Sequence, residues 1–520
     1  MRWLILVAAG CGIDTGFDTP PSAASLPVRV QLVTDAQYRN AVHDLLGDVK
    51  VPALHSPGTT PDQFIHEDVL AVDAPLLVQY RIAAESIAAE VAADPGRLGC
   101  DAADDRCLRI WIDRLAVRAF RRPIYASEHD QLAALYDAGV AGGGPGAGIG
   151  LVVEAVLQAP SFVYRTEIGP PPGAPPGTDV ELTPYELASE LGALLLDSIP
   201  DDALWAAARD GSLADRDVLA AQVDRLLGLP RVRDHLVDVV LDWLEVPAIF
   251  TAGKDAMKYP EMTPELRASM YGETRQFVAE VLWHRRGSLR VLLTSNESFI
   301  DARLAEIYGM RFITADELVP VILDPRRRGG ILTQPSVLAL AATPQSESIV
   351  RRGLFIERKL LCQPDLGRPP FSTIAAVASQ VASLSEAQYS VYRTTTAYCA
   401  GCHGAIDPPG RTLHHFDGLG RWRNIDAVDD DIDATASLML DDREREVDGA
   451  LAMARALADS DQVAHCVVDQ LAHYALGRTV DDPALSDYLY SSFDRSERDL
   501  VAVFRALATA PVFRMRREVP

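Results

Sequence analysis

The chain has 520 residues, 48% of them hydrophobic and 23% charged, a composition typical of a folded globular protein. This length exceeds one ordinary hydrophobic core, so about two to four domains are expected. The net charge of −24 argues against nucleic-acid binding and against docking on anionic lipid through a basic face, and it favours a cationic partner.

Residues 1–25 resemble a bacterial lipoprotein signal and tether. Arg2 precedes a short apolar run, and small residues then lead to Cys11, which would be lipidated and become the first mature residue. Elsewhere no uncharged apolar stretch reaches the ~18 residues that a membrane span needs. The sequence therefore predicts an exported protein, periplasmic or anchored to the outer membrane only through lipid.

Residues 26–168 are predicted to form N-terminal helical domains. Thr34 and Gln37 have the spacing of a capping box that begins a helix. Cys100 and Cys107 enclose a short acidic loop, and export would place them in an oxidising compartment, so we expect a local disulfide between them.

Three arginines of this region, Arg118, Arg121 and Arg122, can hold an anionic ligand, although arginines on a helix face are usually solvated or salt-bridged. The glycine-rich stretch 142–150 is predicted to be a surface loop. The proline- and glycine-rich stretch 169–177 is predicted to be an interdomain linker.

Residues 179–362 are predicted to form a central helical domain, with strand-like alternation only near 318–323 and 330–334. Cys362 and Cys466 are either single or paired with each other, and the sequence leaves both alternatives open. A proline-containing stretch separates this domain from residues 371–520. The predicted fold class is mainly α, a multidomain helical protein.

The most informative segment is Cys-Ala-Gly-Cys-His, which contains Cys399, Cys402 and His403. Two thiols one helical turn apart can each form a thioether with a porphyrin vinyl group, and the adjacent imidazole becomes the proximal iron ligand. The spacing predicts one covalent haem c within residues 371–520, so the mainly α chain is expected to end in a C-terminal cytochrome c-like helical module. The helix expected at 385–400 would end at the motif, with 465–476 or 498–509 packing across it.

Three other interpretations of the motif remain. The cysteines could be a thioredoxin-like redox pair, but no βαβ pattern surrounds them. They could bind zinc with His403 and either His414 or His415, although a second zinc knuckle is missing. The motif could also be degenerate and carry no cofactor.

The distal iron ligand is predicted to be Met439, narrowly ahead of Met453, and core packing is the alternative for each methionine. His414 or His415 could also return to the iron, and a solvent-facing turn is the alternative for both.

After His403, the segment 407–410 (Asp-Pro-Pro-Gly) is predicted to form a turn, and Phe416 and Trp422 either cover a haem face or pack in the core. Residues 426–448 hold ten carboxylates and two arginines. They are expected to form a solvated acidic loop or a docking patch for a basic electron carrier.

Several motifs together resemble the large multidomain cytochrome-like proteins of planctomycete and myxobacterial type. The motifs are Gln37–Asn40 with Asp44–Gly47, Arg118–Pro123, Ala159–Glu167, Leu182–Ala188, Pro200–Leu204, Arg328–Gln334 with Arg352-Gly353, Cys399–Gly410, Phe416–Arg421 and Tyr474–Arg478. The resemblance implies consecutive domains of unknown function and a secreted or envelope-bound haem protein. The family often has a methionine where this chain has Ile406.

We therefore expect an exported haem c protein that transfers single electrons at the cell envelope to a redox partner protein, for which a basic electron carrier is a candidate. One alternative is a haem-coupled oxidoreductase whose catalytic pocket lies in the helical domains. Another is a haem-free envelope protein with a binding or structural role. Whether the chain is an enzyme, and on what substrate, is not evident from the sequence.

Overall fold

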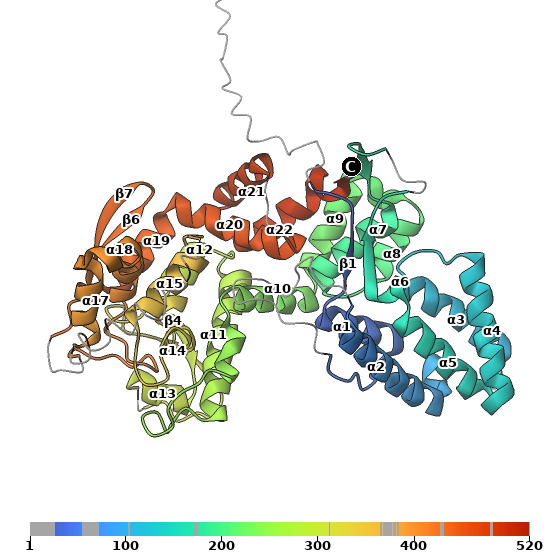
Figure 1. The fold of residues 1–520 in the computed structure, drawn as a ribbon. Helices are drawn as coiled ribbons and strands as arrows, with labels where there is room; N and C mark the ends of the chain where they lie inside the picture. Colours follow the sequence, from blue (N-terminus) through green and yellow to red (C-terminus); the bar gives the residue numbers. More distant parts are fainter. Residues whose placement is uncertain are drawn as a thin grey trace, which may run out of the picture.

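The computed structural model describes residues 26–54, 72–101, 104–170, 175–310, 312–364, 367, 377, 381, 384–426, 431–478 and 482–518. In these residues the chain is mainly helical, and its short strands form two-stranded sheets. The predicted fold class is thereby confirmed. Figure 1 shows helix groups that follow one another along the chain, with the last helices lying along the central ones.

The N-terminal unit, residues 26–170, has a hydrophobic core of its own. Its helices are α1 (Asp35–Leu46), α2 (Ala74–Ala93), η1 (Pro95–Leu98), α3 (Asp105–Ala119), α4 (Ala126–Gly143), α5 (Pro145–Gln158) and α6 (Pro160–Val163). Strand β1 (Arg29–Leu32) pairs antiparallel with β2 (Tyr164–Glu167). The core holds residues from 32 to 163 and one residue from beyond the unit, Ile199.

Two local predictions for this unit had different outcomes. The capping box is confirmed, because Thr34 Oγ1 accepts from the Gln37 N–H at 3.0 Å and Gln37 Oε1 from the Thr34 N–H at 3.2 Å. The loop predicted at 142–150 is wrong, because α4 and α5 occupy it. A Cβ on Gly139 would lie 2.6 Å from Gly148 Cα, so these glycines permit a close helix crossing.

The central segment begins with strand β3 and ends with helix α15. Its elements are β3 (Asp179–Glu181), α7 (Pro184–Leu191), the π-helical turn η2 (Gly192–Leu196), α8 (Asp202–Arg209), η3 (Ser212–Ala214), α9 (Arg216–Leu227), α10 (Pro230–Trp243), η4 (Val246–Phe250), α11 (Pro264–His284), α12 (Leu289–Thr294), β4 (Glu297–Ile300), α13 (Ala302–Tyr308), β5 (Val319–Ile322), η5 (Ile331–Thr333), α14 (Pro335–Leu340) and α15 (Ile349–Lys359). The strand predicted near 318–323 is therefore confirmed. The strand predicted at 330–334 is wrong, because Gly330 has a φ of 67° and a 3₁₀ turn follows it.

The C-terminal segment is built mainly of helices. Its elements are α17 (Glu386–Thr395), α18 (Ala397–Arg411), β6 (Thr435–Leu440), β7 (Arg443–Asp448), α19 (Gly449–Asp459), α20 (Asp461–Leu476), α21 (Pro483–Arg495), α22 (Leu500–Thr509), η6 (Pro511–Arg514) and β8 (Met515–Arg517). Strand β8 returns to pair antiparallel with β3. Much of the predicted acidic loop is thus the hairpin β6–β7, in which Ala436, Leu438 and Leu440 alternate toward the interior.

The central and C-terminal segments share one hydrophobic core. It contains Trp243 and Phe277 from the central segment together with Phe493, Phe504 and Phe513 from the C-terminal segment. Residues 371–520 are predicted to be a module, but their helices α19, α20 and α22 pack against α12, α10 and α9 of the central segment. The domain boundary near 370 stays a prediction.

Two disulfides are present in the described residues. Cys100 and Cys107 are bonded to each other, as are Cys362 and Cys466, the pair that the sequence left open. Both bonds are compatible with an exported protein. The lipidation prediction at Cys11 and the signal at 1–25 lie outside the described residues. Within the described part of the chain, no helix is both long and apolar enough to cross a membrane.

Candidate functional site

The predicted attachment residues lie in the first turns of helix α18. Helix α17 ends at Thr395, and the extended residue Thr396 separates it from α18. The expected helix at 385–400 is therefore wrong in one respect: the motif begins a helix and does not end one. The helix that packs most extensively on α18 is α15, and α17 and β6 also flank it. Figure 1 shows α15, α17 and α18 side by side.

Helix α18 continues through Pro408 and Pro409, so the predicted turn at 407–410 is wrong. Each proline removes one helical hydrogen bond and disfavours a helix interior. Thr412 Oγ1 donates to the Pro409 carbonyl at 2.7 Å. This part of α18 lies in close contact with α15.

Glycines on both helices allow α15 and α18 to approach backbone to backbone. A Cβ on Gly353 of α15 would lie 1.8 Å from the carbonyl oxygen of Ile406. A Cβ on Gly410 of α18 would lie 1.9 Å from the carbonyl oxygen of Ile349. Any larger residue at either position would push the helices apart, so these glycines fix the position of the motif.

The outer face of α18 is open. Cys399 is half-buried, Cys402 is exposed, and neither forms a disulfide. Their three-residue spacing places both thiols on one side of the helix, one turn apart. A Cβ added at Gly401 or Gly404 would meet no atom within 4 Å, so a bulky group could lie against this face.

His403 is anchored to a buried carboxylate one turn later in α18. Its Nδ1 lies 2.8 Å from Oδ1 of Asp407, whose side chain is fully buried. Burial alone would raise the pKa of Asp407, but the hydrogen bond from His403 and the charge of Arg393 hold it below its usual value. Because an ionised carboxylate only accepts, this hydrogen bond requires a proton on Nδ1, the tautomer that leaves the lone pair of a neutral imidazole on Nε2.

Asp407 is held in turn by α17 and α15. Arg393 of α17 donates from Nε to Oδ2 of Asp407 at 2.9 Å and from Nη2 to Glu386 Oε1 at 3.2 Å. The same Glu386 oxygen accepts from the backbone N–H of Ile349 at the start of α15 at 3.1 Å. One polar chain therefore links three helices to the imidazole.

Arg352, the neighbour of Gly353, holds the chain that follows α18. It is fully buried, and its guanidinium donates to the carbonyl oxygens of Leu413, Phe416 and Asp417, each at 2.7 Å. The Arg352-Gly353 motif thus fixes both α18 and the turn beyond it.

The two aromatic residues after the motif pack against the protein. Phe416 is fully buried, and the Arg328 guanidinium lies 4.7 Å from its ring centre. Trp422 stacks on His415, with ring centres 4.4 Å apart and planes within 6°. Phe416 therefore takes the core-packing alternative.

The four candidate distal ligands have different surroundings. Met439 is 64% exposed on β6, the strand that flanks α18, and its role as a ligand stays a prediction. Met453 is fully buried, and its sulfur accepts from Thr412 Oγ1 at 2.9 Å. His414 is also buried, and burial lowers its pKa to about 4. His415 Nδ1 contacts the Arg423 carbonyl oxygen at 2.8 Å.

No group of three or more His, Cys, Asp or Glu residues within the described ranges is arranged to hold a metal ion. His414 and His415 contact Arg423 and Trp422 instead of the motif. The zinc interpretation, which required one of them beside the cysteines, therefore has no support from this geometry.

Four family models match the chain one after another, and each is described as a protein of unknown function. They are DUF1595 at residues 107–167, DUF1592 at 182–310, DUF1588 at 328–426 and DUF1585 at 443–513. The chain is a tandem array of domains of unknown function. This confirms the multidomain part of the predicted resemblance. No curated protein and no solved structure matches the chain.

The DUF1588 domain contains the three helices of the motif site. Its match runs from 328 to 426 and so includes α15, α17 and α18. It also crosses the boundary that the sequence placed near 370. Arg328, at its first residue, donates to the Thr333 carbonyl at 2.7 Å and to the Gly420 carbonyl. The arginine motifs of this domain therefore hold its backbone together.

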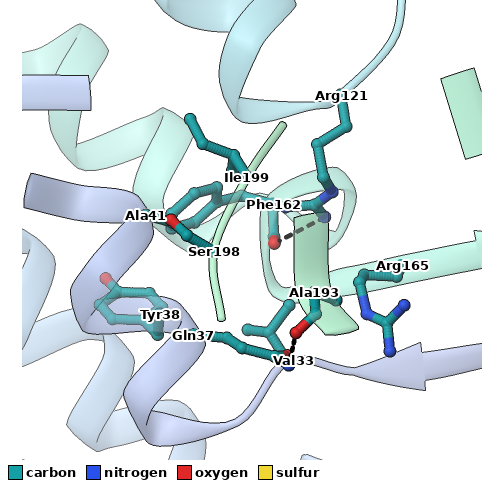
Figure 2. A pocket seen from close by; sticks show the side chains of 10 residues that line it. All are labelled: Val33, Gln37, Tyr38, Ala41, Arg121, Phe162, Arg165, Ala193, Ser198 and Ile199. Carbon is teal, nitrogen blue, oxygen red and sulfur yellow. Dashed lines mark hydrogen bonds between the residues drawn. The ribbon is translucent and has the colours of Figure 1, made fainter. Parts of the chain in front are cut away.

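The three arginines considered as an anion site in the N-terminal unit serve its structure. Arg121 Nη2 donates to the carbonyl oxygens of Ser161, Phe162 and Tyr164 at 2.6–3.1 Å. Figure 2 shows Arg121 reaching the Phe162 carbonyl beside the cavity. Arg122 pairs with Glu128 at 2.8 Å, and Arg118 donates to the Pro200 carbonyl at 2.7 Å.

The cavity in Figure 2 and its neighbour lie where the N-terminal unit meets the central segment. Gln37, Arg165 and Ala193 line both cavities. Their volumes are about 10 and 20 Å³, room for about one water molecule each. Neither can hold an organic substrate.

Asp407 was not among the site residues predicted from the sequence. Its spacing of four residues from His403 places both side chains on one face of a helix, which is a usable signal. The two prolines that follow it led to the prediction of a turn, and this prediction concealed the signal.

Proposed function

We propose that this chain is an exported haem c protein that transfers single electrons at the cell envelope. The observation that supports it best is the combination on α18: two unpaired thiols one turn apart on an open face, next to an imidazole held by its Nδ1. Few other cofactors require this combination at this spacing.

The residues present fit a covalently attached haem. Cys399 and Cys402 would form the two thioether links, and His403 would be the proximal ligand through Nε2. Bound there, haem would supply reversible one-electron chemistry at iron. Met439 is the proposed distal ligand, because it lies exposed on the strand beside α18. Its thioether would favour the reduced state.

We propose a basic electron carrier as the redox partner. The acidic hairpin β6–β7 lies next to α18, and the whole chain carries a charge of −24. Opposite charges would speed the encounter more than they would strengthen the complex. Export, with or without lipid at Cys11, would bring the protein into the compartment where a carrier of this kind acts.

The decisive experiment is expression of the full chain in a periplasm with haem-attachment machinery. We expect a covalent adduct of ~600 Da by mass spectrometry and a reduced-minus-oxidised α-band, as thioether attachment requires. Cys399→Ser should abolish two-link attachment, and Tyr398→Ser, an exposed neighbour in the same turn, should load as the parent does. A colourless parent protein whose Cys399 and Cys402 both react with an alkylating reagent would refute the proposal.

A further inference from the structure

The partner of the His403 imidazole is a buried carboxylate. Nδ1 and Asp407 Oδ1 are 2.8 Å apart, and the Asp407 side chain has no exposed surface. A backbone carbonyl in this place would orient the ring equally well, but it would bring only a partial charge. The carboxylate instead brings a full negative charge to within hydrogen-bond distance of the imidazole that would ligate iron.

The carboxylate cannot turn away from the ring. Its second oxygen, Oδ2, accepts from Arg393 Nε at 2.9 Å, so both oxygens have fixed partners. The Arg393 guanidinium lies 4.2 Å from the ring centre of Tyr389, and Glu386 binds its Nη2 at 3.2 Å. The pair is therefore preorganised before any ligand binds.

We infer that Asp407 is a positioning residue that holds His403 in one orientation and lowers the reduction potential of iron ligated at Nε2. This inference rests on the proposed haem function. A hydrogen bond to a carboxylate raises the basicity of a histidine ligand, and a more electron-rich ligand stabilises ferric over ferrous iron. The charge of Asp407 would thus oppose the effect of the Met439 thioether, so the potential would lie below that of the same haem with an uncharged partner at His403.

Two carboxylates of this site permit a matched comparison. Asp407 and Glu386 both bind Arg393, but only Asp407 contacts the imidazole. Asp407→Asn removes the charge from the hydrogen bond to His403, whereas Glu386→Gln removes a charge from Arg393 and leaves that hydrogen bond in place. If Asp407 acted only by balancing Arg393, the two variants would behave alike.

The test measures haem content and then reduction potential in the full chain and its variants. We expect Asp407→Asn to shift the ferric–ferrous equilibrium at least tenfold toward ferrous iron, which raises the reduction potential by about 59 mV for one electron. Glu386→Gln should raise the potential by less than a third of that amount. An unloaded parent would refute the haem proposal itself. If the parent carries haem but Asp407→Asn leaves the potential unchanged, or if the two variants shift it equally, the inference about Asp407 is overturned and the haem proposal stands.

Asp407→Glu covers the case in which the asparagine variant fails to load. It keeps the charge, so a loaded glutamate variant with a potential close to that of the parent would support the inference. A raised potential in that variant would overturn it. If neither Asp407 variant loads while Glu386→Gln does, Asp407 is needed for folding or attachment, and the inference is again overturned.

Discussion

The N-terminal unit and the segment that carries the attachment motif are stabilised in different ways. The N-terminal unit packs around its own core, and its disulfide joins Cys100 to Cys107 across seven positions. The attachment segment packs around a core shared with the central helices, and its disulfide joins Cys362 to Cys466 across 104 positions. The N-terminal unit is therefore stabilised mainly by its own core, and the attachment segment by packing against the central helices.

This difference shows how an exposed motif can be rigidly placed. The outer face of α18 makes few contacts, but its inner face is fixed by α15 and by the polar chain from Glu386 to His403. The precision of the site therefore depends on residues of α15 and α17, which the motif itself does not reveal.

The largest difference should come from removing the two disulfides separately. In the chain-entropy model, a closed loop of the length between Cys362 and Cys466 contributes about 5 kcal/mol, and one of the length between Cys100 and Cys107 about 2.5 kcal/mol. Replacing both Cys362 and Cys466 by alanine should therefore destabilise the central and C-terminal segments. The loss should be about twice the loss in the N-terminal unit when Cys100 and Cys107 are replaced by alanine. Urea unfolding followed by circular dichroism and limited proteolysis measures both.

Equal decreases in the free energy of unfolding after removal of the two disulfides would contradict this difference between the regions. They would mean that residual structure in the unfolded chain already keeps Cys362 and Cys466 close together, so that the bond removes little entropy. Proteolysis sites identify the region that opens, which matters because a chain of several domains need not unfold in one step.

A smaller effect is expected from the helix contact itself. Gly353→Ala places a Cβ 1.8 Å from the Ile406 carbonyl, and a backbone oxygen cannot move aside without moving α18. We expect a loss of about 3 kcal/mol, at the upper end for overpacking. Protease cleavage should become faster within α18 and not in the N-terminal unit.

Gly404→Ala is the matched control on the outer face of the same helix. Its added Cβ meets nothing within 4 Å, and alanine is the better helix former by 0.5–1 kcal/mol in general, so stability should be unchanged or slightly higher. Equal destabilisation by the two variants would show that α18 is not positioned by α15.

Sequence patterns predicted the helical class, the capping box at Thr34 and the disulfide between Cys100 and Cys107, because each depends on neighbours close in the chain. The alternation of Ala436, Leu438 and Leu440 was also available but was obscured by the acidic residues around it. The contact between Gly353 and Ile406 could not be predicted, since it depends on which helices meet.

Composition misled where tertiary packing overrides local preference. Glycine at 142–150 and proline at 408 and 409 both favour loops in an isolated chain. In the folded protein both stretches are helical, because neighbouring helices press against them. The missed residue Asp407 lies in the second stretch, so the error in secondary structure became an error about the site.

The smallest effect concerns pH. Glu357 of α15 is buried, and burial raises its pKa from about 4.5 to about 7. Between these values the folded chain binds more protons than the unfolded chain, so this group's contribution to stability is complete below pH 4.5 and is lost as the pH rises through 7. Glu357→Gln, which does not titrate, should therefore match the parent at pH 4.5 and exceed it by about 2–3 kcal/mol at pH 8.

Glu128 in the N-terminal unit provides the control with the opposite sign. The hydrogen bond from Arg122 lowers its pKa, so its contribution is present above the unfolded pKa and is lost as the pH falls through the folded one. Glu128→Gln should therefore be less stable than the parent at pH 8, and the deficit should shrink toward acid pH. Urea midpoints at several pH values test both variants. If the midpoints of Glu357→Gln and of the parent changed in parallel with pH, the carboxyl of Glu357 would reach water. The contact between α15 and its neighbours would then be looser than the burial of Glu357 indicates.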